Sequence, residues 1–268
     1  MKLTKRKQAE TAVLTMSDIH YGKHTKTFNP DVCKRRLDRI GVKLGRIREL
    51  LGEYEINQLV VMLLGDANDG NDIFATQAHE QAITNVEQQA WELSDYLAGW
   101  LKNQKEIWPS IRVECVPGNH GRSKGSAEAA NWDFVMYRYL KMKAKQYARV
   151  GYGEGEWLRK VAIRGHQYVL FHGHDVRSFS GIPFYGLLLR MTRWMSTKLA
   201  PFDLALVGHF HTSGTWRINN MRLVLSGTMV SDDDWAMRIL GWESATEWSL
   251  FGVSNKRPIT WQFPIELV

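Results

Sequence analysis

The sequence predicts an α/β fold of four layers, in which two mixed β-sheets pack face to face and helices cover both outer faces (αββα). Three observations support this fold class. Apolar runs typical of strands alternate with longer helical patterns in the first half of the chain, and the second half is richer in strand patterns. Five predicted strands end in residues that can bind a metal or transfer a proton, and sites in open α/β sheets form at such ends.

The first half is predicted to contain three strands and three helices after a basic arm at residues 1–10, which we expect to fray. Asn29 and Pro30 supply an N-cap and a first-turn proline for the first helix, which is amphipathic. The second strand is apolar throughout, as expected of a central strand covered on both faces. The expected ranges are 11–17, 59–64 and 111–116 for the strands and 31–52, 82–100 and 127–150 for the helices.

The second half is predicted to contain seven short strands and one helix. Gly165 marks the turn between the first two strands, and Asn219-Asn220 marks a hairpin turn. Helix 184–199 lies between two loops with candidate ligands, so a lid, a homodimer or partner surface, a groove wall and plain core all stay open. No repeat or linker interrupts the chain, and residues 11–268 are predicted to form one domain. The expected strands are 157–163, 168–171, 203–207, 215–218, 223–226, 249–253 and 260–263.

The composition is that of an ordinary soluble globular protein and does not favour disorder, with 44% hydrophobic and 24% charged residues. Two cysteines, the absence of a long apolar run and a basic start without a following apolar segment predict a cytoplasmic protein that does not enter a membrane. The net charge of +7 favours a polyanionic partner such as nucleic acid, although a solvated basic face explains it as well. Some of the 11 tryptophans are expected to stack on bases and most to lie in the core.

The five strand ends carry carboxylate, amide and imidazole side chains. Such mixed donors suit Mn, Fe or Zn and exclude copper(I) and iron-sulfur clusters. A carboxylate that bridges two ions would hold them about 3.5 to 4 Å apart, a separation suited to phosphoryl displacement. At the last strand end we expect Gly208 to let the chain turn sharply, so that two histidines aim at neighbouring points. The pairs, in chain order, are Asp18 and His20, Asp66 and Asp69, Asn119 and His120, His172 and His174, and His209 and His211.

Together these motifs (Asp-x-His, Gly-Asp-x-x-Asp, Gly-Asn-His, His-Gly-His and Gly-His-x-His) resemble the calcineurin-like metallophosphoesterases, which include serine/threonine phosphatases and the Mre11/SbcD nucleases. The resemblance runs from Asp18 to His211 and implies two divalent ions, manganese first, with Fe, Zn, Ni, Co or Mg as alternatives. It implies a bridging Asp66, a general acid at His120 and an Asp69 that accepts the other ring N–H of that histidine. The implied ligands are Asp18, His20, Asp66 and His211 for one ion and Asp66, Asn119, His172 and His209 for the other.

The chain departs from the family pattern at two positions. The phosphatase branch usually has an acidic residue after Gly-Asn-His and an arginine after Gly-Asp-x-x-Asp, where this chain has Gly121 and Gly70. Arg122 or Lys124 is instead expected to bind the phosphate. An equal alternative is that the loop carrying these two residues is a solvated turn without a role in binding. His174 is expected to face the substrate or to support the ligands, because in the family the earlier histidine of His-Gly-His binds the metal.

Other features are expected to contribute less to the chemistry. His24, His79 and His166 are expected to be surface or core residues without a metal role. No capping domain of the Mre11 type follows the core, so a nuclease interpretation rests on the core alone. The tail at 227–249, with its run of aspartates, resembles small stand-alone family members carried by phages.

Three functions therefore remain open. The first is a phosphodiesterase or nuclease that hydrolyses DNA or RNA with metal-activated water, favoured by the basic balance and the aromatic residues. The second is a phosphomonoesterase that acts on phosphoprotein or nucleotide with the same centre. The third is a binding protein that keeps the fold without catalysis, which the complete set of motifs disfavours.

Overall fold

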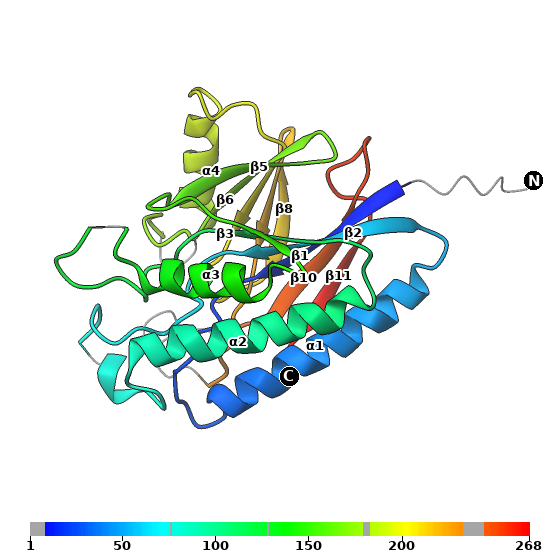
Figure 1. Ribbon diagram of the computed structural model, residues 1–268. Helices are drawn as coiled ribbons and strands as arrows, with labels where there is room; N and C mark the ends of the chain where they lie inside the picture. Colours follow the sequence, from blue (N-terminus) through cyan, green and yellow to red (C-terminus); the bar gives the residue numbers. More distant parts are fainter. Residues whose placement is uncertain (1–8, 76, 128, 179–182, 233–243) are drawn as a thin grey trace, which may run out of the picture.

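Two mixed β-sheets lie face to face at the centre of the structure (Figure 1). The computed structural model describes residues 9–75, 77–127, 129–178, 183–232 and 244–268. The first sheet has the strand order β11 (Gln262–Glu266), β10 (Glu247–Val253), β1 (Ala9–Met16), β2 (Glu55–Leu63), β3 (Ile111–Cys115) and β4 (Arg149–Gly151). The second has the order β5 (Leu158–Ile163), β6 (His166–Phe171), β7 (Leu204–Val207), β9 (Met221–Leu225) and β8 (Gly214–Ile218).

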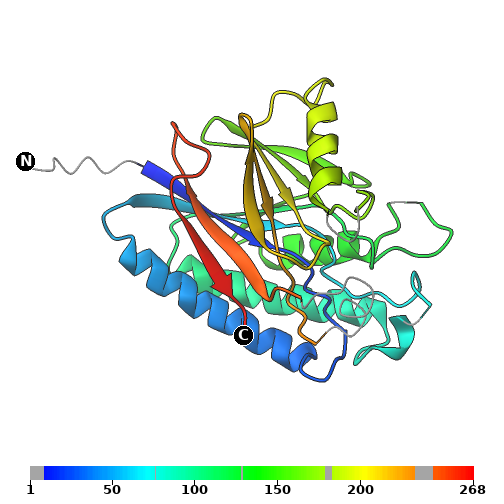
Figure 2. The ribbon, with the colours of Figure 1, turned by 180° about the vertical axis from the view of Figure 1, so that it is seen from behind.

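Helices cover the outer faces of both sheets, which confirms the predicted αββα architecture (Figure 2). The first sheet packs against α1 (Pro30–Leu50), α2 (Val86–Lys105) and α3 (Trp132–Lys143) in one buried apolar cluster. The second sheet packs against α4 (Phe184–Trp194) in another. A third cluster lies between the sheets. Three buried layers therefore separate the four layers of secondary structure.

Strand β1 shows how the alternation of side chains produces this stacking. Val13 belongs to the cluster between the sheets, whereas Ala12, Leu14 and Met16 belong to the cluster under the helices. Because successive side chains of a strand point to opposite faces, an unbroken apolar run buries both faces at once. The central strands are therefore apolar throughout.

Capping residues set the helix boundaries and correct two expected ranges. Asn29 Oδ1 accepts hydrogen bonds of 3.0 Å from the backbone N–H groups of Asp31 and Val32 and starts α1 as expected. Asn85 caps α2, which therefore starts at residue 86 rather than 82. Asn131 caps α3, and residues 149–151 pair with β3, so the helix expected at 127–150 is shorter at both ends.

Other boundaries differ by a few residues. Strand β1 begins at Ala9, inside the expected arm, and residues 1–8 lie outside the described part of the chain. Strand β2 begins four residues before the expected start, and β11 lies two residues later than expected. Helix α4 ends at Trp194 instead of residue 199 because the N–H groups of Ser196 and Thr197 bond three residues back, as in a tightening last turn. No helix in the described ranges is long and apolar enough to cross a membrane.

The topology brings the five predicted strand ends together. Strands β1, β2 and β3 run parallel in the first sheet, and β6 and β7 run parallel in the second. The carboxyl ends of parallel strands meet at one edge of a sheet. Hydrogen bonds continue past these ends, with Asp18 N–H donating to Gly65 O at 3.1 Å and Gly208 N–H to His172 O at 3.1 Å.

Candidate metal centre

The loops after β1, β2, β3, β6 and β7 carry all seven predicted metal ligands, and their backbone is unusual. Left-handed φ angles of 47° to 69° occur at five of these ligands, namely Asp18, His20, Asp66, His209 and His211. In the described part of the chain only three other non-glycine residues have a positive φ. This conformation costs free energy and concentrates at functional sites. The surrounding structure therefore enforces these side-chain directions.

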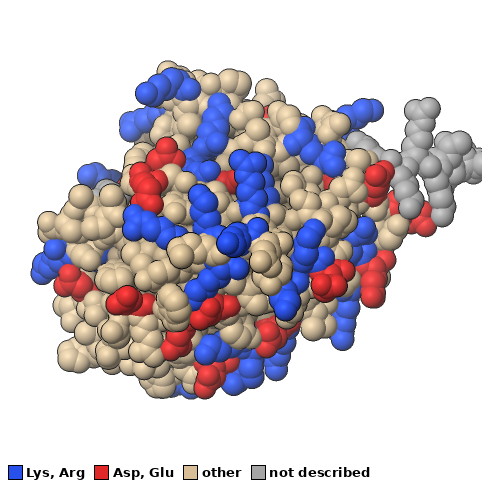
Figure 3. Space-filling view, viewed as in Figure 1, with Lys and Arg blue, Asp and Glu red and all other residues tan. Residues whose placement is uncertain are grey.

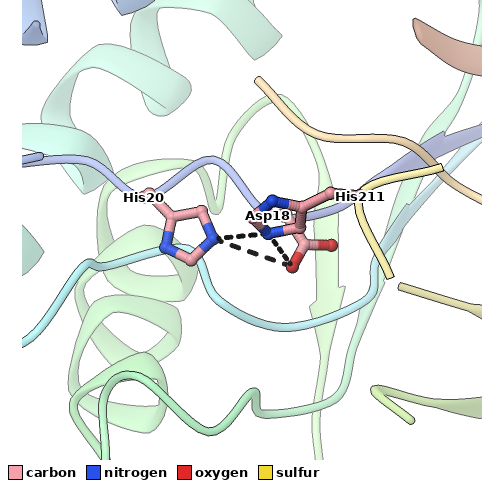
Figure 4. Close-up of side chains that lie close together, drawn as sticks. All are labelled: Asp18, His20 and His211. Atoms are coloured by element: carbon pink, nitrogen blue, oxygen red, sulfur yellow. Dashed lines mark hydrogen bonds and ion pairs between the residues drawn. The ribbon is translucent and has the colours of Figure 1, made fainter. Parts of the chain in front are cut away.

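The first candidate metal site consists of Asp18, His20 and His211 (Figure 4). The two Nε2 atoms lie 3.1 Å apart. Asp18 Oδ1 lies 3.7 Å from His20 Nε2 and 3.4 Å from His211 Nε2. One carboxylate oxygen and two imidazole nitrogens thus point at a common position, as ligands of one cation do.

The second candidate site consists of Asp66, His172 and His209. His172 Nε2 lies 2.9 Å from Asp66 Oδ2. His172 Nδ1 lies 2.8 Å from the Leu64 carbonyl oxygen and donates to it, which leaves Nε2 as the nitrogen that faces the site. Imidazole ligands of metals are usually oriented by such a backbone carbonyl.

Two buried oxygen atoms of the centre lack a hydrogen-bond partner, and a metal would satisfy them. Among the described residues, this holds for Asp18 Oδ1 and Asn119 Oδ1. Both side chains are almost completely buried. A buried polar atom without a partner costs about 1 to 3 kcal/mol. These residues therefore fit a cofactor of two divalent cations, including Asn119, whose amide oxygen is a hard-metal donor.

One detail of the centre differs from the implied roles. Asp66 Oδ1 accepts a 2.8 Å hydrogen bond from the His120 backbone N–H, and Asp66 groups only with the second candidate site. Asp18 Oδ1 lies within 4.0 Å of His172 Nε2 as well as of the histidines of the first site. In this arrangement Asp18 stands between the two sites, and the bridging role of Asp66 stays a prediction.

Charges within the centre shift the pKa values strongly. Burial would lower the pKa of His20, but the carboxylates of Asp18, Asp69 and Asp66 outweigh it and raise the pKa to about 10. Burial would also lower the pKa of His172, but the carboxylates of Asp66 and Asp18 outweigh burial and raise this pKa to about 9. His209 shows the reverse, because burial and the charge of His172 lower its pKa to about 3.

The carboxylates respond in the opposite sense. Burial alone would raise the pKa of Asp18, but His20, His211 and His172 hold it well below its usual range. The pKa of Asp66 is also depressed, because the charges of His172 and His120 outweigh its burial. The centre therefore keeps its carboxylates ionised.

The expected general acid, His120, lies beside the first site. Its Nδ1 is 3.3 Å from Asp69 Oδ1, and the same oxygen is 3.2 Å from His20 Nδ1. Burial would raise the pKa of Asp69, but hydrogen bonds and charges from His120 and His20 outweigh burial and hold this pKa below its usual range. The Phe74 ring lies 4.9 Å from the His120 ring, and Gln77 Nε2 lies 3.4 Å from His120 Nδ1. Asp69 therefore holds two imidazoles at once.

Asp133 is a buried residue of the site that the sequence did not reveal. Its Oδ2 accepts a 2.8 Å hydrogen bond from Gly118 N–H. Its Oδ1 accepts 3.1 Å bonds from the N–H groups of Ala67 and Asn68. Asp133 thus ties the loop that carries Asp66 to the loop that carries Asn119. An aspartate in the first turn of a helix is common as a partner of the helix dipole, so its position gave no distinctive signal.

Gly208 serves a different purpose from the expected one. Its φ is not left-handed, and the sharp turn is made by His209 and His211. A Cβ at Gly208 would overlap Ser17 Oγ and approach Asp18 Oδ2 to 2.8 Å. The glycine therefore permits close approach between the loops, and Ser17 and the His209 N–H both donate to Asp18 Oδ2.

The predicted substrate residues have different surroundings. Arg122 Nε donates to the Asn119 carbonyl at 3.1 Å, which keeps this residue beside the centre. The Lys124 side chain is exposed, and its backbone N–H donates to Asp72. His174 lies near the second site, with its ring centroid 6.2 Å from that of His209.

The three remaining histidines lie away from the candidate ligands. His24 and His79 are exposed. His166 Nε2 lies 3.0 Å from the Ser254 carbonyl oxygen. None of the three occurs in a cluster of potential ligands among the described residues. The aspartate-rich part of the tail, residues 233–243, lies outside the described residues.

Comparison with known proteins identifies a family. A family profile described as calcineurin-like phosphoesterase matches residues 11–227. No curated protein matches the chain. An archaeal phosphodiesterase structure has 11% identity and a TM-score of 0.42, covering 94% of this chain and 99% of the other. Zn-bound Vps29 from Entamoeba histolytica has 12% identity and a TM-score of 0.42, covering 96% and 99%. A phosphoesterase predicted in Streptococcus pneumoniae TIGR4 has 11% identity and a TM-score of 0.38, covering 95% and 98%.

Proposed function

The chain belongs to the calcineurin-like phosphoesterase family, and from this premise we propose that it is a phosphodiesterase that hydrolyses DNA or RNA with two divalent metal ions. Family membership supports a phosphoester hydrolase in general. The observation that carries the proposal is the pair of candidate metal sites in adjacent buried loops, with polar atoms that lack partners among the described residues. The choice of nucleic acid as the substrate goes beyond what family membership supports and belongs to the proposal.

In this proposal Asp18, His20 and His211 bind one ion, and Asn119, His172 and His209 bind the other, with Asp66 shared. When bound, the two ions would supply positive charge to the phosphoryl oxygens and would lower the pKa of water. Manganese is the first choice because the resemblance to the family implies it, and the mixture of carboxylate and amide oxygen with imidazole nitrogen suits it. The same donors accept Fe, Zn, Ni, Co or Mg.

His120 is proposed to protonate the leaving oxygen. Its Nδ1 is engaged with Asp69, so Nε2 is the nitrogen that can hold a proton toward the substrate. Its side chain is 19% exposed, whereas His20 beside it is fully buried. His120 is therefore the imidazole of this pair that a substrate can reach.

A polyanionic substrate is supported by charge near the centre as well as by the net charge of +7. Burial and the charges of His172 and Arg122 lower the pKa of His174 to about 4. His174 is thus neutral at pH 7 and can exchange hydrogen bonds with a phosphate that Arg122 attracts. Neither residue is needed to bind the ions, so both are proposed to contact the substrate.

The proposal is tested by measuring hydrolysis of several phosphate esters by the Mn-loaded protein. The substrates are linear and circular DNA, single-stranded and double-stranded, together with RNA, p-nitrophenyl phosphate and bis(p-nitrophenyl) phosphate. We expect cleavage of nucleic acid and of the diester, loss of both in EDTA, and loss of both in Asp66→Ala.

Two other outcomes would overturn the proposal. Rapid hydrolysis of the monoester without cleavage of any nucleic acid would identify a phosphomonoesterase. Inactivity toward every ester, with metal content confirmed by elemental analysis, would identify a binding protein with the family fold.

A further inference from the structure

A cavity of about 500 Å³ lies at the end of the first sheet opposite the candidate metal centre. It is formed where α2 and α3 end and where β3 and the edge strand β4 begin. Its lining includes four cations, Lys105, Lys141, Lys145 and Arg149, and no acidic side chain among its described residues. We call it the basic cavity.

The four cations lack the carboxylate partners that neighbouring cations have. On the same helix and loop, Arg138 pairs with Glu154 at 2.6 Å and Lys143 pairs with Asp95 at 2.5 Å. None of the four cations of the basic cavity lies within 4.0 Å of a carboxylate oxygen in the described part of the chain. Lys105 Nζ donates to the Pro109 carbonyl instead. The cavity therefore concentrates positive charge that no side chain neutralises, which attracts anions.

The surroundings of the basic cavity are also rich in positive charge. Figure 3 shows lysine and arginine side chains across the middle of the face that carries α2, α3 and β5, with aspartate and glutamate side chains among and below them. Such a surface raises the local concentration of a polyanion and accelerates its association. A ligand with many phosphates would use this surface more fully than a single small anion.

We propose that the basic cavity binds the backbone phosphates of a nucleic-acid strand whose scissile bond lies at the metal centre. This inference rests on the proposed function, because that function supplies the nucleic acid. Strand β3, which begins at the basic cavity and leads to the loop that carries Asn119, is roughly 15 Å long at about 3.3 Å per residue. Successive phosphates on one strand of a duplex advance about 3.4 Å along the helix axis, so a stacked strand needs at least about five nucleotides to span the length of β3 and contact both sites.

The test compares two double variants that remove the same charge from different places. Lys141→Gln/Lys145→Gln alters the basic cavity, and Lys256→Gln/Arg257→Gln alters an exposed turn between β10 and β11. Fluorescence anisotropy measures the Kd for labelled single-stranded DNA of 20 and 4 nucleotides, in EDTA and at several KCl concentrations. Inorganic phosphate is added as a competitor in a separate series.

We expect the cavity variant to bind the 20-mer about tenfold more weakly at 100 mM KCl and to show a salt slope smaller by about 1.4, since each single-strand phosphate contact contributes about 0.7. The turn variant should keep most of the affinity, and the 4-mer should not distinguish the variants. The inference is overturned if both variants lose affinity equally, which indicates general charge attraction. It is also overturned if millimolar phosphate abolishes the difference, which indicates a site for free phosphate.

Hydrolysis of bis(p-nitrophenyl) phosphate separates this inference from the proposed function. The small diester is too short to reach the basic cavity, so both variants should hydrolyse it at the wild-type rate. If the cavity variant hydrolyses the diester at the wild-type rate and also binds the 20-mer with unchanged affinity, the role of the basic cavity is overturned and the proposed function stands. Weakened binding by that variant, in a protein that cleaves no ester, would overturn the enzymatic proposal and leave the cavity as a nucleic-acid site.

Discussion

Oδ1 of Asp69 lies 3.3 Å from Nδ1 of His120, and this contact determines which imidazole nitrogen can face a substrate. His120→Ala should therefore lower kcat by about 100- to 10,000-fold toward a diester with a poor leaving group. The loss should be much smaller with p-nitrophenol as leaving group, since this group departs without protonation. Metal content, measured by elemental analysis, should not change. Near-normal turnover of the poor substrate would exclude His120 as the general acid.

The same carboxylate oxygen lies 3.2 Å from His20 Nδ1, so Asp69 supports a metal ligand as well as the general acid. Asp69→Asn should lower metal affinity by about 10- to 100-fold, as other losses of a ligand-orienting carboxylate do. It should also lower kcat at saturating metal. His120→Ala is the matched control, because it should affect only the rate. Metal titration calorimetry of both variants separates the two effects, and equal affinities would contradict the role at His20.

The raised pKa values of His20 and His172 predict a pH dependence of metal binding. At pH 7 both imidazoles are protonated in the metal-free protein, with pKa values of about 10 and 9. Ligation requires neutral imidazole, so loading both sites at pH 7 should release about two protons. Calorimetry in buffers of different ionisation enthalpy counts them, and His172→Gln should release about one fewer. Loading without proton release would contradict the protonated state.

The same shifts predict how the metal-free fold responds to pH. The pKa of each of these histidines is higher in the folded state than the ordinary value of 6.5. Their contribution to the free energy of unfolding is therefore fully present below about pH 6.5 and is lost as the pH rises through about 9 to 10. Urea unfolding of the metal-free protein at pH 7 and pH 10 should show this loss, which saturating metal should largely remove.

Asp133 should contribute more to the stability of the fold than an ordinary aspartate in the first turn of a helix does. Asp133→Asn replaces one buried carboxylate oxygen with an amide NH₂ that faces backbone N–H donors, so we expect a loss of about 2 to 4 kcal/mol in the free energy of unfolding. Asp31→Asn is the matched control, since Asp31 is an exposed first-turn aspartate of α1, and should cost under about 0.5 kcal/mol. Similar urea midpoints for the two variants would contradict the role.

The fold class could be predicted because strand and helix patterns are local, but several boundaries could not. The helical pattern of 127–150 continues through residues that belong to other elements. Asn131 interrupts it because its side chain caps the following turn. Residues 149–151 form β4 because β3 offers a partner strand. Such tertiary contacts override local propensity and leave no pattern in the sequence.

The residues of the centre divide in the same way. The predicted ligands follow the strand ends directly, as Asp18 follows β1 and His172 follows β6, so a short motif is enough to reveal them. Asp133 reaches the centre from the first turn of α3, and Gln77 reaches it from a short 3₁₀ helix (Gln77–His79), and only folding brings them there. Gly118 and Gly208 are an intermediate case. The sequence shows that they belong to the ligand motifs, but only the structure shows which atoms they contact.

Gly118 offers a direct test of how closely the loops of the centre must pack. A Cβ at this position would overlap Oδ1 and the backbone nitrogen of Asp66, and no side-chain rotation can move the backbone nitrogen away. Gly118→Ala should therefore displace Asp66, lower the free energy of unfolding by about 1 to 3 kcal/mol as overpacking does, and weaken metal binding. Gly99→Ala is the matched control, because Gly99 lies on an exposed face of α2 with open space around its Cβ. That variant should be more stable by about 0.5 to 1 kcal/mol, since alanine favours the helix. Thermal unfolding and metal titration of both variants check the prediction, and unchanged metal affinity in Gly118→Ala would show that the loops can separate without loss of the centre.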